Sequence, residues 1–260
     1  MIAVELNGIT TGYRSGNEER VVSKDLNVCL HSGELICLIG PNGAGKSTLL
    51  RTIARFQPAL QGEVLLHGKK SDAYTADEMA KELSVVLTDN SHIHDLTAFE
   101  VVAMGRMPYT GFWGRLSDAD EKIVNQCIEW VGAENVAERN FQTLSDGERQ
   151  RVMIAKAIAQ QTPIVLLDEP TAFLYYPNKV AMMLLLRRLA HEMNKCILMS
   201  VHDIDLALQV ADGILFMNAD GNVISGRPAD LSGDGTIERL VSSDNIGFDR
   251  GKRSFFVVDK

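Results

Sequence analysis

The stretch GPNGAGKST fills residues 40–48 and satisfies the pattern G-x-x-x-x-G-K-[ST]. Residues 34–39 before it predict a strand and the residues after it predict a helix, which is the setting that this pattern requires. Gly40, Gly43 and Gly45 allow a tight turn whose N–H groups face inward, and the start of the helix adds a positive potential. The stretch therefore predicts a loop that binds phosphate.

Two side chains of this loop carry further chemistry for a bound nucleotide. Lys46 can reach the β- and γ-phosphates as a point charge, and the Ser47 hydroxyl can complete the octahedral shell of a Mg²⁺ ion. The residues predicted to bind the nucleotide are Gly40, Pro41, Asn42, Gly43, Ala44, Gly45, Lys46, Ser47 and Thr48. A glycine turn that happens to contain a lysine is the alternative, and the strand and helix expected on either side disfavour it.

A second apolar run, IVLLDE at residues 164–169, ends in two carboxylates. A phosphate-binding loop of this kind needs an acid at the end of a neighbouring strand to hold Mg²⁺, directly or through water. We assign Asp168 to the metal shell and Glu169 to polarising the attacking water. The alternative is a pair of solvated carboxylates at a strand end before Pro170, which the loop at residues 40–48 makes the weaker interpretation.

Composition narrows the class of protein. The chain has 260 residues, of which 45% are hydrophobic and 23% charged, as in folded globular proteins rather than disordered ones. A net charge of −8 without a cluster of Lys and Arg points away from nucleic acid as a partner. No apolar run approaches the roughly 20 residues that a membrane helix needs, and the start lacks a secretory leader. The four cysteines are scattered without a C-x-x-C, so we expect reduced, structural thiols and a cytoplasmic protein.

The order of predicted elements indicates an α/β fold. We expect strands at 3–6, 26–30, 34–39, 64–66, 84–87, 164–168, 196–201 and 213–217, and helices at 98–104, 118–131, 146–161, 181–193 and from 204. Residues 107–116 are expected to form a loop. The prediction is a single domain over 1–260: a P-loop NTPase core of 1–87 and 161–260, with a mostly parallel sheet and an antiparallel β segment, and a helical insertion over 88–160. The tail from 234 to 260 is expected to add a small helix and strand.

Residues 144–150 read LSDGERQ, in which Ser145 and Glu148 fit the S-x-x-E capping box of a helix. Capping explains these two residues but not the whole string. LSDGERQ resembles the LSGGQ signature of the ATP-binding cassette family, and GPNGAGKST, IVLLDEPT and SVHD at 200–203 match other motifs of that family in order. The resemblance covers nearly the whole chain.

In that family two cassettes enclose two ATP molecules, each bound by the P-loop of one subunit and the signature of the other. The resemblance implies that Ser145 and Gly147 contact the γ-phosphate of the opposite site. It implies that His202 hydrogen-bonds the γ-phosphate or the attacking water, and that Tyr13 stacks on adenine. A polar strand terminus and a solvent-facing turn tyrosine are the alternatives for these two residues.

Three positions depart from the family pattern. The family usually has Gln where the helical insertion begins, and here Thr88 or its neighbours must serve. Asp146 replaces the second signature glycine, where an acid would repel phosphate unless its side chain points away or caps the helix. Tyr175 stands where an Asp is usual in the loop that helps to couple the two sites. These differences bear on cooperativity and turnover, while Lys46 and Glu169 remain in place.

Residues 104–120, MGRMPYTGFWGRLSDAD, look like the GR-x-P…(W)GR-x-S-x-x-D stretch of cassettes that serve iron-siderophore, haem and cobalamin uptake. The resemblance implies an ATPase that uses ATP and Mg²⁺ and works with a second copy of itself, a polytopic permease and, indirectly, a substrate-binding protein. Such a subunit lies at the cytoplasmic face of the inner membrane as a peripheral protein. Phe112 and Trp113 are candidates for the permease contact, or for a local core under the loop.

Two other functions stay open at this point. A soluble cassette ATPase acting on nucleic acid or the ribosome is disfavoured by the single cassette, the lack of a heptad run and the net charge of −8. The second is a nucleotide-binding regulator that does not hydrolyse ATP, which is favoured by the departures from the family pattern at Thr88, Asp146 and Tyr175. His92 and His94 are not expected to form a metal site, because no second pair of ligands stands nearby in the sequence.

Overall fold

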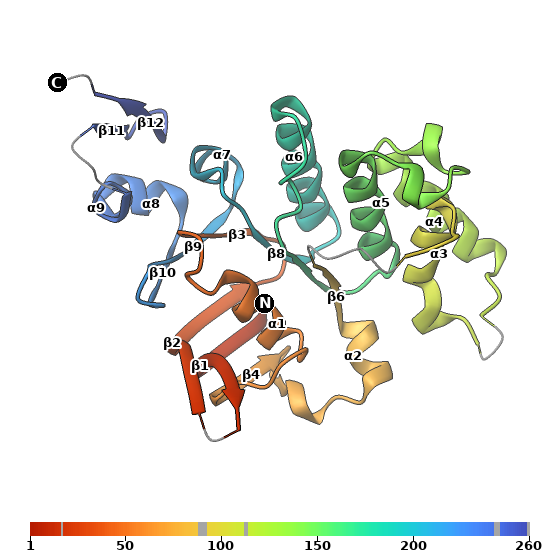
Figure 1. The fold of residues 1–260 in the computed structure, drawn as a ribbon, viewed down its shortest axis with the longest axis horizontal. Helices are drawn as coiled ribbons and strands as arrows, with labels where there is room; N and C mark the ends of the chain where they lie inside the picture. Colours follow the sequence, from red (N-terminus) through yellow and green to blue (C-terminus); the bar gives the residue numbers. More distant parts are fainter. Residues whose placement is uncertain (17, 88–92, 112–113, 242–244, 259–260) are drawn as a thin grey trace.

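The computed structural model describes residues 1–16, 18–87, 93–111, 114–241 and 245–258 (Figure 1). At its centre is a six-stranded sheet in the order β10-β9-β3-β8-β7-β6. Its strands are β3 (Leu35–Ile39), β6 (Leu83–Val86), β7 (Ile164–Leu167), β8 (Cys196–Ser200), β9 (Gly213–Met217) and β10 (Val223–Gly226). All neighbours pair in parallel except β10, which runs antiparallel to β9 at the edge. Every residue of β3, β7 and β8 is buried, as expected of a parallel sheet covered on both faces.

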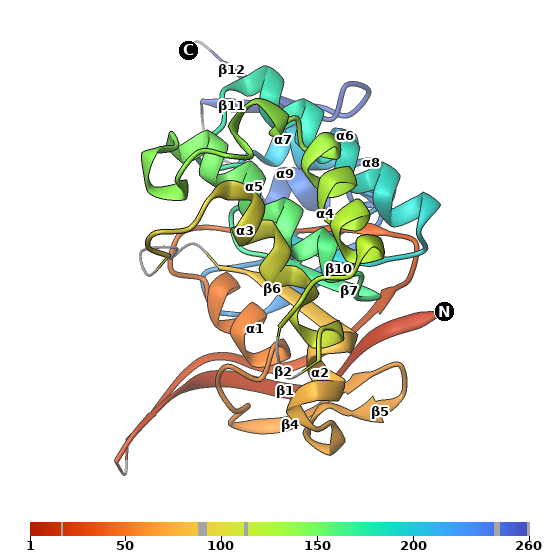
Figure 2. The same cartoon turned by 90° about the vertical axis from the view of Figure 1, so that its right-hand side faces the viewer.

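A second, antiparallel sheet covers one face. It has the order β2-β1-β4-β5 and consists of β1 (Ile2–Ser15), β2 (Glu18–His31), β4 (Gln61–Leu66) and β5 (Lys69–Lys70). Helix α1 (Lys46–Ile53) lies between the two sheets (Figures 1 and 2). Leu49 and Ile53 of α1 share one buried cluster with Leu6 of β1 and Leu38 of β3. This packing fixes the start of α1, and with it residues 40–48, against the central sheet.

Helices cover the other face of the central sheet. They are α5 (Asp146–Ala159), α6 (Tyr176–Glu192) and α7 (Ile204–Val210), and a second buried cluster joins Ile154, Leu186 and Leu208 to Leu167 of β7. Between β6 and α5 the chain forms α3 (Ala98–Ala103), α4 (Asp118–Trp130) and the 3₁₀ helices η2 (Met104–Tyr109), η3 (Glu134–Val136) and η4 (Phe141–Thr143). Helices α3 and α4 pack against α5 rather than against the sheet. The result is a helical layer at one end of the molecule (Figure 1).

Helix α8 (Pro228–Gly233) precedes the tail that begins at residue 234. The described part of that tail contains the expected small helix, α9 (Thr236–Val241), and two strands rather than one, paired as a hairpin of β11 (Ile246–Asp249) and β12 (Ser254–Val257). The N–H of Phe255 donates to Asp205 Oδ1 over 2.9 Å, and the rings of Phe248 and Phe255 are 4.8 Å apart. The tail therefore packs on α7 at the end of the molecule away from α3 and α4 (Figure 1).

The predicted fold class is confirmed: an α/β P-loop core with a mostly parallel sheet, an antiparallel sheet and inserted helices. The elements differ in detail. Strands β1 and β2 each run for 14 residues, and irregularities in their register, as at Leu6 to Ile9, break the alternation that marks a strand in sequence. Helix α6 begins at Tyr176, earlier than expected, because Pro177 occupies its first turn. The short elements η1 (Ser71–Ala73) and α2 (Ala76–Glu82) were not expected.

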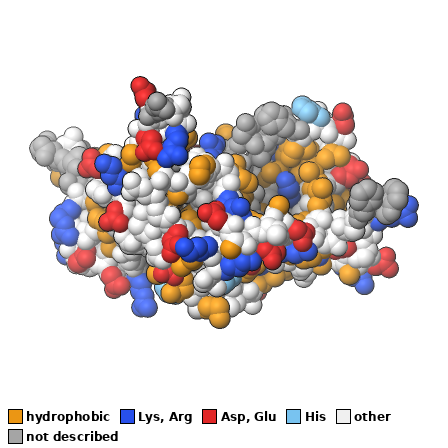
Figure 3. All heavy atoms as spheres, turned by 90° about the horizontal axis from the view of Figure 1, so that it is seen from below, with side chains coloured by type: hydrophobic (Ala, Val, Ile, Leu, Met, Phe, Trp, Pro, Cys, Tyr) orange, Lys and Arg blue, Asp and Glu red, His pale blue; other side chains and the backbone are white. Residues whose placement is uncertain are grey.

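The cysteines and the charges complete the description. Cys37, Cys127 and Cys196 are buried and Cys29 is exposed. Burial raises the pKa of the Cys127 and Cys196 thiols to about 12, so these thiols stay protonated. Figure 3, a view from below, shows Lys and Arg interspersed with Asp and Glu over the described residues of that face. No helix in the described part of the chain is long and apolar enough to span a bilayer.

Candidate nucleotide-binding site

The loop at residues 40–48 joins β3 to α1 and depends on glycine for its shape. Gly40, Gly43 and Gly45 have φ angles of 149°, 81° and 107°, and Gly45 is the N-cap of α1. A Cβ atom on Gly40 would lie 2.0 Å from the carbonyl oxygen of Met217, and one on Gly45 would lie 2.3 Å from Val22 Cγ1. Side chains at these two positions would collide with β9 and β2, so only glycine lets the loop turn here.

Lys46 folds back across this loop. Its Nζ donates to the carbonyl oxygens of Gly40, over 2.8 Å, and Pro41, over 3.1 Å. Burial lowers the pKa of Lys46, and the carboxylates of Glu169 and Asp168 act in the opposite direction. The structure therefore brings together the three charged groups that the sequence assigned to the site, although they come from two different strand ends.

Tyr13 lies beside the loop. It belongs to β1, and its hydroxyl is 2.9 Å from Thr48 Oγ1, while 47% of its surface is exposed. The hydrogen bond ties the phenol to the start of α1 and leaves much of the residue open to solvent. An aromatic residue is thus placed at the edge of the loop, where the sequence predicts stacking on a base.

The ends of β7 and β8 carry the polar groups that face this loop. The Ser200 hydroxyl donates to Asp168 Oδ1 over 2.7 Å and accepts from the Glu169 N–H over 2.9 Å. His202 Nε2 is 2.7 Å from Glu169 Oε1. Glu169 has a φ of 51°, in the left-handed region that few non-glycine residues adopt. The two carboxylates are therefore held by Ser200, the last residue of the adjacent strand, and by His202, two positions beyond it.

Ser200 has no predicted role, although it is the first residue of the SVHD motif at 200–203. It is fully buried, and every other residue of β8 is apolar. A hydroxyl in such a strand costs free energy unless it is hydrogen-bonded. The single polar residue in a continuous apolar strand is the signal that could have singled it out.

The signature segment begins α5. Ser145 is the N-cap, and it forms the predicted capping box with Glu148: the Glu148 N–H donates to Ser145 Oγ over 3.4 Å, and Glu148 Oε2 accepts from the Ser145 N–H over 2.8 Å. Asp146 is drawn toward Arg149, with 3.6 Å between Oδ1 and Nη2. Within the described residues, no hydrogen bond or ion pair joins Ser145 or Gly147 to the loop at 40–48. The structure of one chain therefore keeps the signature separate from its own P-loop.

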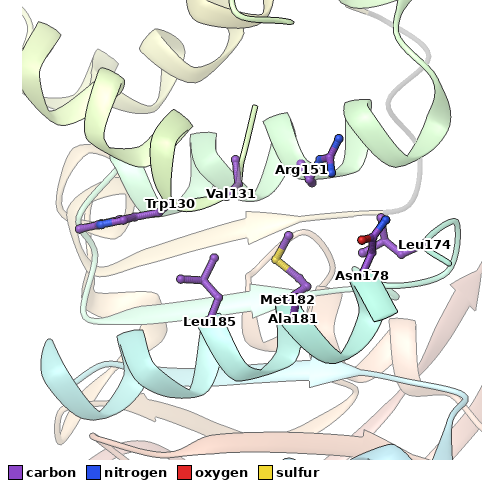
Figure 4. A pocket seen from close by; sticks show the side chains of 8 residues that line it. All are labelled: Trp130, Val131, Arg151, Leu174, Asn178, Ala181, Met182 and Leu185. Atoms are coloured by element: carbon purple, nitrogen blue, oxygen red, sulfur yellow. The ribbon is translucent and has the colours of Figure 1, made fainter. Parts of the chain in front are cut away.

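A cavity of about 110 Å³ lies where the inserted helices meet α6 (Figure 4). Its walls are Trp130, Val131, Arg151, Leu174, Asn178, Ala181, Met182 and Leu185. None of these residues belongs to the loop at 40–48, and neither Asp168 nor Glu169 is among them, so this cavity is not the nucleotide site. Leu174 also borders the signature, since a Cβ on Gly147 would lie 3.4 Å from Leu174 Cδ2. The signature thus packs on the loop that leaves Glu169, and in that loop Tyr175 is 77% exposed.

The oxygens near the loop suit one kind of metal. Ser47 offers a hydroxyl and Asp168 a carboxylate, and such hard oxygen donors match Mg²⁺. Elsewhere, the parts of the chain that the structure describes hold no group of three or more His, Cys, Asp or Glu side chains fit for a metal ion. Thr88 and His92 lie outside the described residues, as do Phe112 and Trp113.

A glycine loop between a buried strand and a helix, with carboxylates at the next but one strand, defines a P-loop nucleoside triphosphatase. Residues 23–172 match the ABC transporter family. The chain belongs to this family, whose cassettes hydrolyse ATP to ADP and phosphate in step with transport.

Similar proteins span almost the whole chain. The chain is 41% identical to an uncharacterized ABC transporter ATP-binding protein of Methanocaldococcus jannaschii over 94% of its own length and 83% of that protein. It is 38% identical to the petrobactin import ATP-binding protein FpuC of Bacillus anthracis over 83% of its length and 79% of that protein.

Two solved structures share the fold. The dimeric ABC transporter cassette MJ0796 superposes with a TM-score of 0.77 at 30% identity, covering 86% of this chain and 98% of that one. An inward-facing metal-chelate type ABC transporter gives a TM-score of 0.78 at 25% identity, with 98% of this chain and 96% of that chain covered.

Proposed function

We propose that this chain is the ATP-hydrolysing subunit of an importer that carries an iron chelate, as a siderophore or haem, or cobalamin through a separate permease. The similarity to the petrobactin import subunit, over 83% of this chain, carries the proposal. The chain's match along 98% of its length to a subunit of a metal-chelate transporter supports it. A cassette of this kind is a peripheral protein at the cytoplasmic face of the cell membrane.

The site residues divide the work as follows. The loop at 40–48 binds the phosphates of ATP, Lys46 turns from its carbonyl partners to the β- and γ-phosphates, and Tyr13 stacks on adenine. Ser47 and Asp168 hold Mg²⁺, which neutralises phosphate charge when bound. Glu169 accepts a proton from the attacking water. Three hydrogen bonds support these roles. They join Lys46 to the Gly40 carbonyl oxygen, the Tyr13 hydroxyl to the Thr48 hydroxyl, and His202 to the Glu169 carboxylate.

His202 has two tasks in this scheme. In the structure it contacts Glu169 Oε1 over 2.7 Å, which orients the carboxylate. With ATP bound, the same imidazole lies within reach of the γ-phosphate or the attacking water. A nucleotide at this site therefore competes for a hydrogen bond that Glu169 holds in its absence.

The second partner is another copy of the chain. In this proposal Ser145 and Gly147 of each copy contact the γ-phosphate bound by the other, at the N-terminal end of α5. The separation of signature and P-loop within one chain and the dimeric form of a related cassette support this arrangement. ATP then shifts the population toward the closed dimer, because only that state makes the signature contacts. The ion pair with Arg149 draws the Asp146 carboxylate aside, which lessens the repulsion expected there.

The proposed division of the single domain is a core of residues 1–87 and 161–260 with a helical insertion over 88–160. The motif at 104–120 lies within the insertion, and two of its residues form a buried ion pair. Arg106 Nε donates to Asp120 Oδ1 over 2.9 Å, and Arg106 Nη1 donates to the carbonyl oxygen of Ala159 over 2.8 Å. This pair, which we call the Arg106 clamp, joins η2, α4 and the last residue of α5.

Gly105 lets the clamp form, because a Cβ atom there would lie 2.3 Å from the carbonyl oxygen of Lys156. Tyr109 covers the clamp, with its ring centre 4.2 Å from the guanidinium carbon of Arg106. The clamp joins Arg106 and Asp120, which stand on either side of the segment 107–116 to which Phe112 and Trp113 belong. We place the permease contact on this segment, since its ends are fixed to the helix that begins with the signature.

Affinity purification tests the proposed function. The chain is tagged in its native cell, the membranes are solubilised gently, and the co-purifying proteins are identified by mass spectrometry. A polytopic permease at one copy per cassette is the expected result, and the genes beside that permease then nominate the chelate and its binding protein. Recovery from the soluble fraction alone, with ribosomal proteins or nucleic acid attached, would instead favour a soluble cassette ATPase. An ATPase assay on the assembled complex separates a non-hydrolysing regulator from both.

A further inference from the structure

We propose that Ser200 is a positioning residue for ATP hydrolysis, which sets the Asp168 carboxylate and the Glu169 backbone through one hydroxyl group. Ser200 Oγ donates to Asp168 Oδ1 over 2.7 Å and accepts from the Glu169 N–H over 2.9 Å. Ser200 is fully buried, so water does not compete for either bond. The inference rests on the roles proposed above for Asp168 and Glu169.

The position of Ser200 in the sheet suits this task. Strand β8 lies between β3, which leads into the phosphate-binding loop, and β7, which leads into the two acids. Ser200 pairs with Leu38 of β3, and the preceding residue, Met199, pairs with Leu167 of β7. The Ser200 hydroxyl therefore lies at the end of β8, between the strand that leads into the phosphate-binding loop, β3, and the strand that leads into Asp168 and Glu169, β7.

The bond to Asp168 fixes the plane of a metal-binding group. A hydrogen bond to an ionised carboxylate is shorter and stronger than one between neutral groups. Because Ser200 holds Oδ1 from inside the sheet, the carboxylate cannot rotate freely about its own axis. A carboxylate held in this way meets the strict octahedral geometry of Mg²⁺ without first losing rotational freedom.

The bond from Glu169 fixes an uncommon backbone conformation. Glu169 has a φ of 51°, and such a conformation persists only where its surroundings hold it. The Ser200 hydroxyl accepts the N–H of this residue, and the Glu169 side chain then reaches His202 at 2.7 Å. Ser200 acts on the proposed base through the main chain, without touching the side chain that takes the proton.

The experiment compares Ser200→Ala with Ser84→Ala. Ser84 is a matched control because it is buried in β6 of the same sheet and its hydroxyl accepts from Thr162 Oγ1 over 3.0 Å, away from the site. Three quantities are measured for each: the melting temperature, kcat for ATP, and the affinity of the protein–ATP complex for Mn²⁺ by electron paramagnetic resonance. For Ser200→Ala we expect kcat to fall at least tenfold and the Mn²⁺ dissociation constant to rise severalfold. For Ser84→Ala we expect a similar melting temperature and little change in the other two.

Equal kcat and Mn²⁺ affinity in the two variants would overturn the inference. Should Ser200→Ala not fold, Ser200→Cys replaces it, since the thiol keeps the volume but is a weak donor and acceptor. It should shift Mn²⁺ affinity in the same direction. Asp168→Asn separates this inference from the proposed function beneath it. If Asp168→Asn binds Mn²⁺ normally, the metal role of Asp168 fails; if it loses Mn²⁺ while the Ser200 variants do not, only the inference about Ser200 fails.

Discussion

His202 Nε2 lies 2.7 Å from Glu169 Oε1, so the residues two positions beyond the ends of β8 and β7 meet side chain to side chain. In a parallel sheet the carboxyl ends of neighbouring strands share one edge, which is where α/β proteins bind their ligands. The contact links the proposed base to the histidine expected to sense the γ-phosphate. Removing either group should therefore affect hydrolysis more than ATP binding.

Replacing Glu169 by Gln should lower kcat at least a hundredfold, since a general base contributes on the order of 10² to 10⁴ in rate. ATP binding should persist, because the amide keeps the size of the side chain, and the variant should accumulate as an ATP-bound dimer. Size-exclusion chromatography with ATP and a phosphate-release assay measure the two effects. Glu129→Gln, an exposed substitution on α4, is the control. Hydrolysis by Glu169→Gln at the wild-type rate would show that Glu169 is not the base.

Replacing Tyr13 by Ala should weaken ATP binding by about 1 to 3 kcal/mol, the usual contribution of stacking between a base and an aromatic ring. Tyr13→Phe keeps the ring and loses only the hydrogen bond to Thr48, so it should bind ATP more tightly than the Ala variant. Titration with a fluorescent ATP analogue gives both dissociation constants. Equal losses in the two variants would assign the effect to the hydroxyl and contradict the stacking role.

The Arg106 clamp should contribute to stability in a pH-dependent way. Hydrogen bonds from the Ser117 hydroxyl and N–H, and then from Arg106, lower the pKa of Asp120 to about 2. Because the unfolded value is about 3.9, the hydrogen bonds that ionised Asp120 accepts from Ser117 and from Arg106 stabilise the fold fully above pH of about 5, and this effect is lost as the pH falls toward 2. Asp120→Asn should lower the free energy of unfolding at pH 7 by about 3 kcal/mol, as for a broken buried ion pair.

Urea unfolding at several pH values between 7 and 3 checks this prediction. The difference between wild type and Asp120→Asn should shrink as the pH falls, since the Asp120 carboxylate of the unfolded wild type takes up a proton at a higher pH than that of the folded protein. Asp118→Asn, in the same first turn of α4 but exposed, should show a smaller difference at pH 7. A difference between wild type and Asp120→Asn that stays constant with pH would argue against the ionised clamp.

A charge introduced at Phe112 or Trp113 should uncouple transport from hydrolysis. Each variant, for example Trp113→Glu, should bind ATP like the wild type and fail to support uptake in cells or in vesicles with the permease. The reason is that a charge in an apolar contact must be desolvated for the permease to dock. Lys122→Glu, an exposed change on α4, provides a control for charge alone. Unchanged uptake in both aromatic variants would remove this segment from the permease interface.

The parts of the fold that could be read from the sequence are those with local signals. Strands β3, β7 and β8 are short apolar runs, and α4 and α5 begin at serine caps three residues before an acid. The long strand β1 could not be read in full, because bulges shift its buried face from one side to the other. The hairpin of β11 and β12 carries a turn signal in Asp249 and Gly251, but each strand has only four residues, too few for alternation to mark it, and packing on α7 holds the pair.

In the site, too, some residues have a local sequence signal and others depend on tertiary contacts. Lys46 and Asp168 follow from motifs, since each motif encodes one strand end and its chemistry. The role of Ser200 could not be predicted, because its partners lie about thirty residues earlier in the chain. No spacing rule links a buried hydroxyl to a carboxylate on the adjacent strand. Arg106 belongs to the family motif at 104–120, yet its contact with Ala159 depends on where α5 ends in the folded protein. Pairings between distant segments belong to the tertiary fold and leave no local pattern.

The unequal burial of the four cysteines makes selective chemical labelling of one of them possible. Cys29 stands alone on the surface of β2, while the other three thiols are enclosed in the protein. A maleimide spin label or fluorophore should therefore attach at one position without any engineered cysteine or removal of native ones. In a complex of two copies, the paired labels would form a molecular ruler, and the distance between them would report on the approach of the subunits through each round of nucleotide turnover.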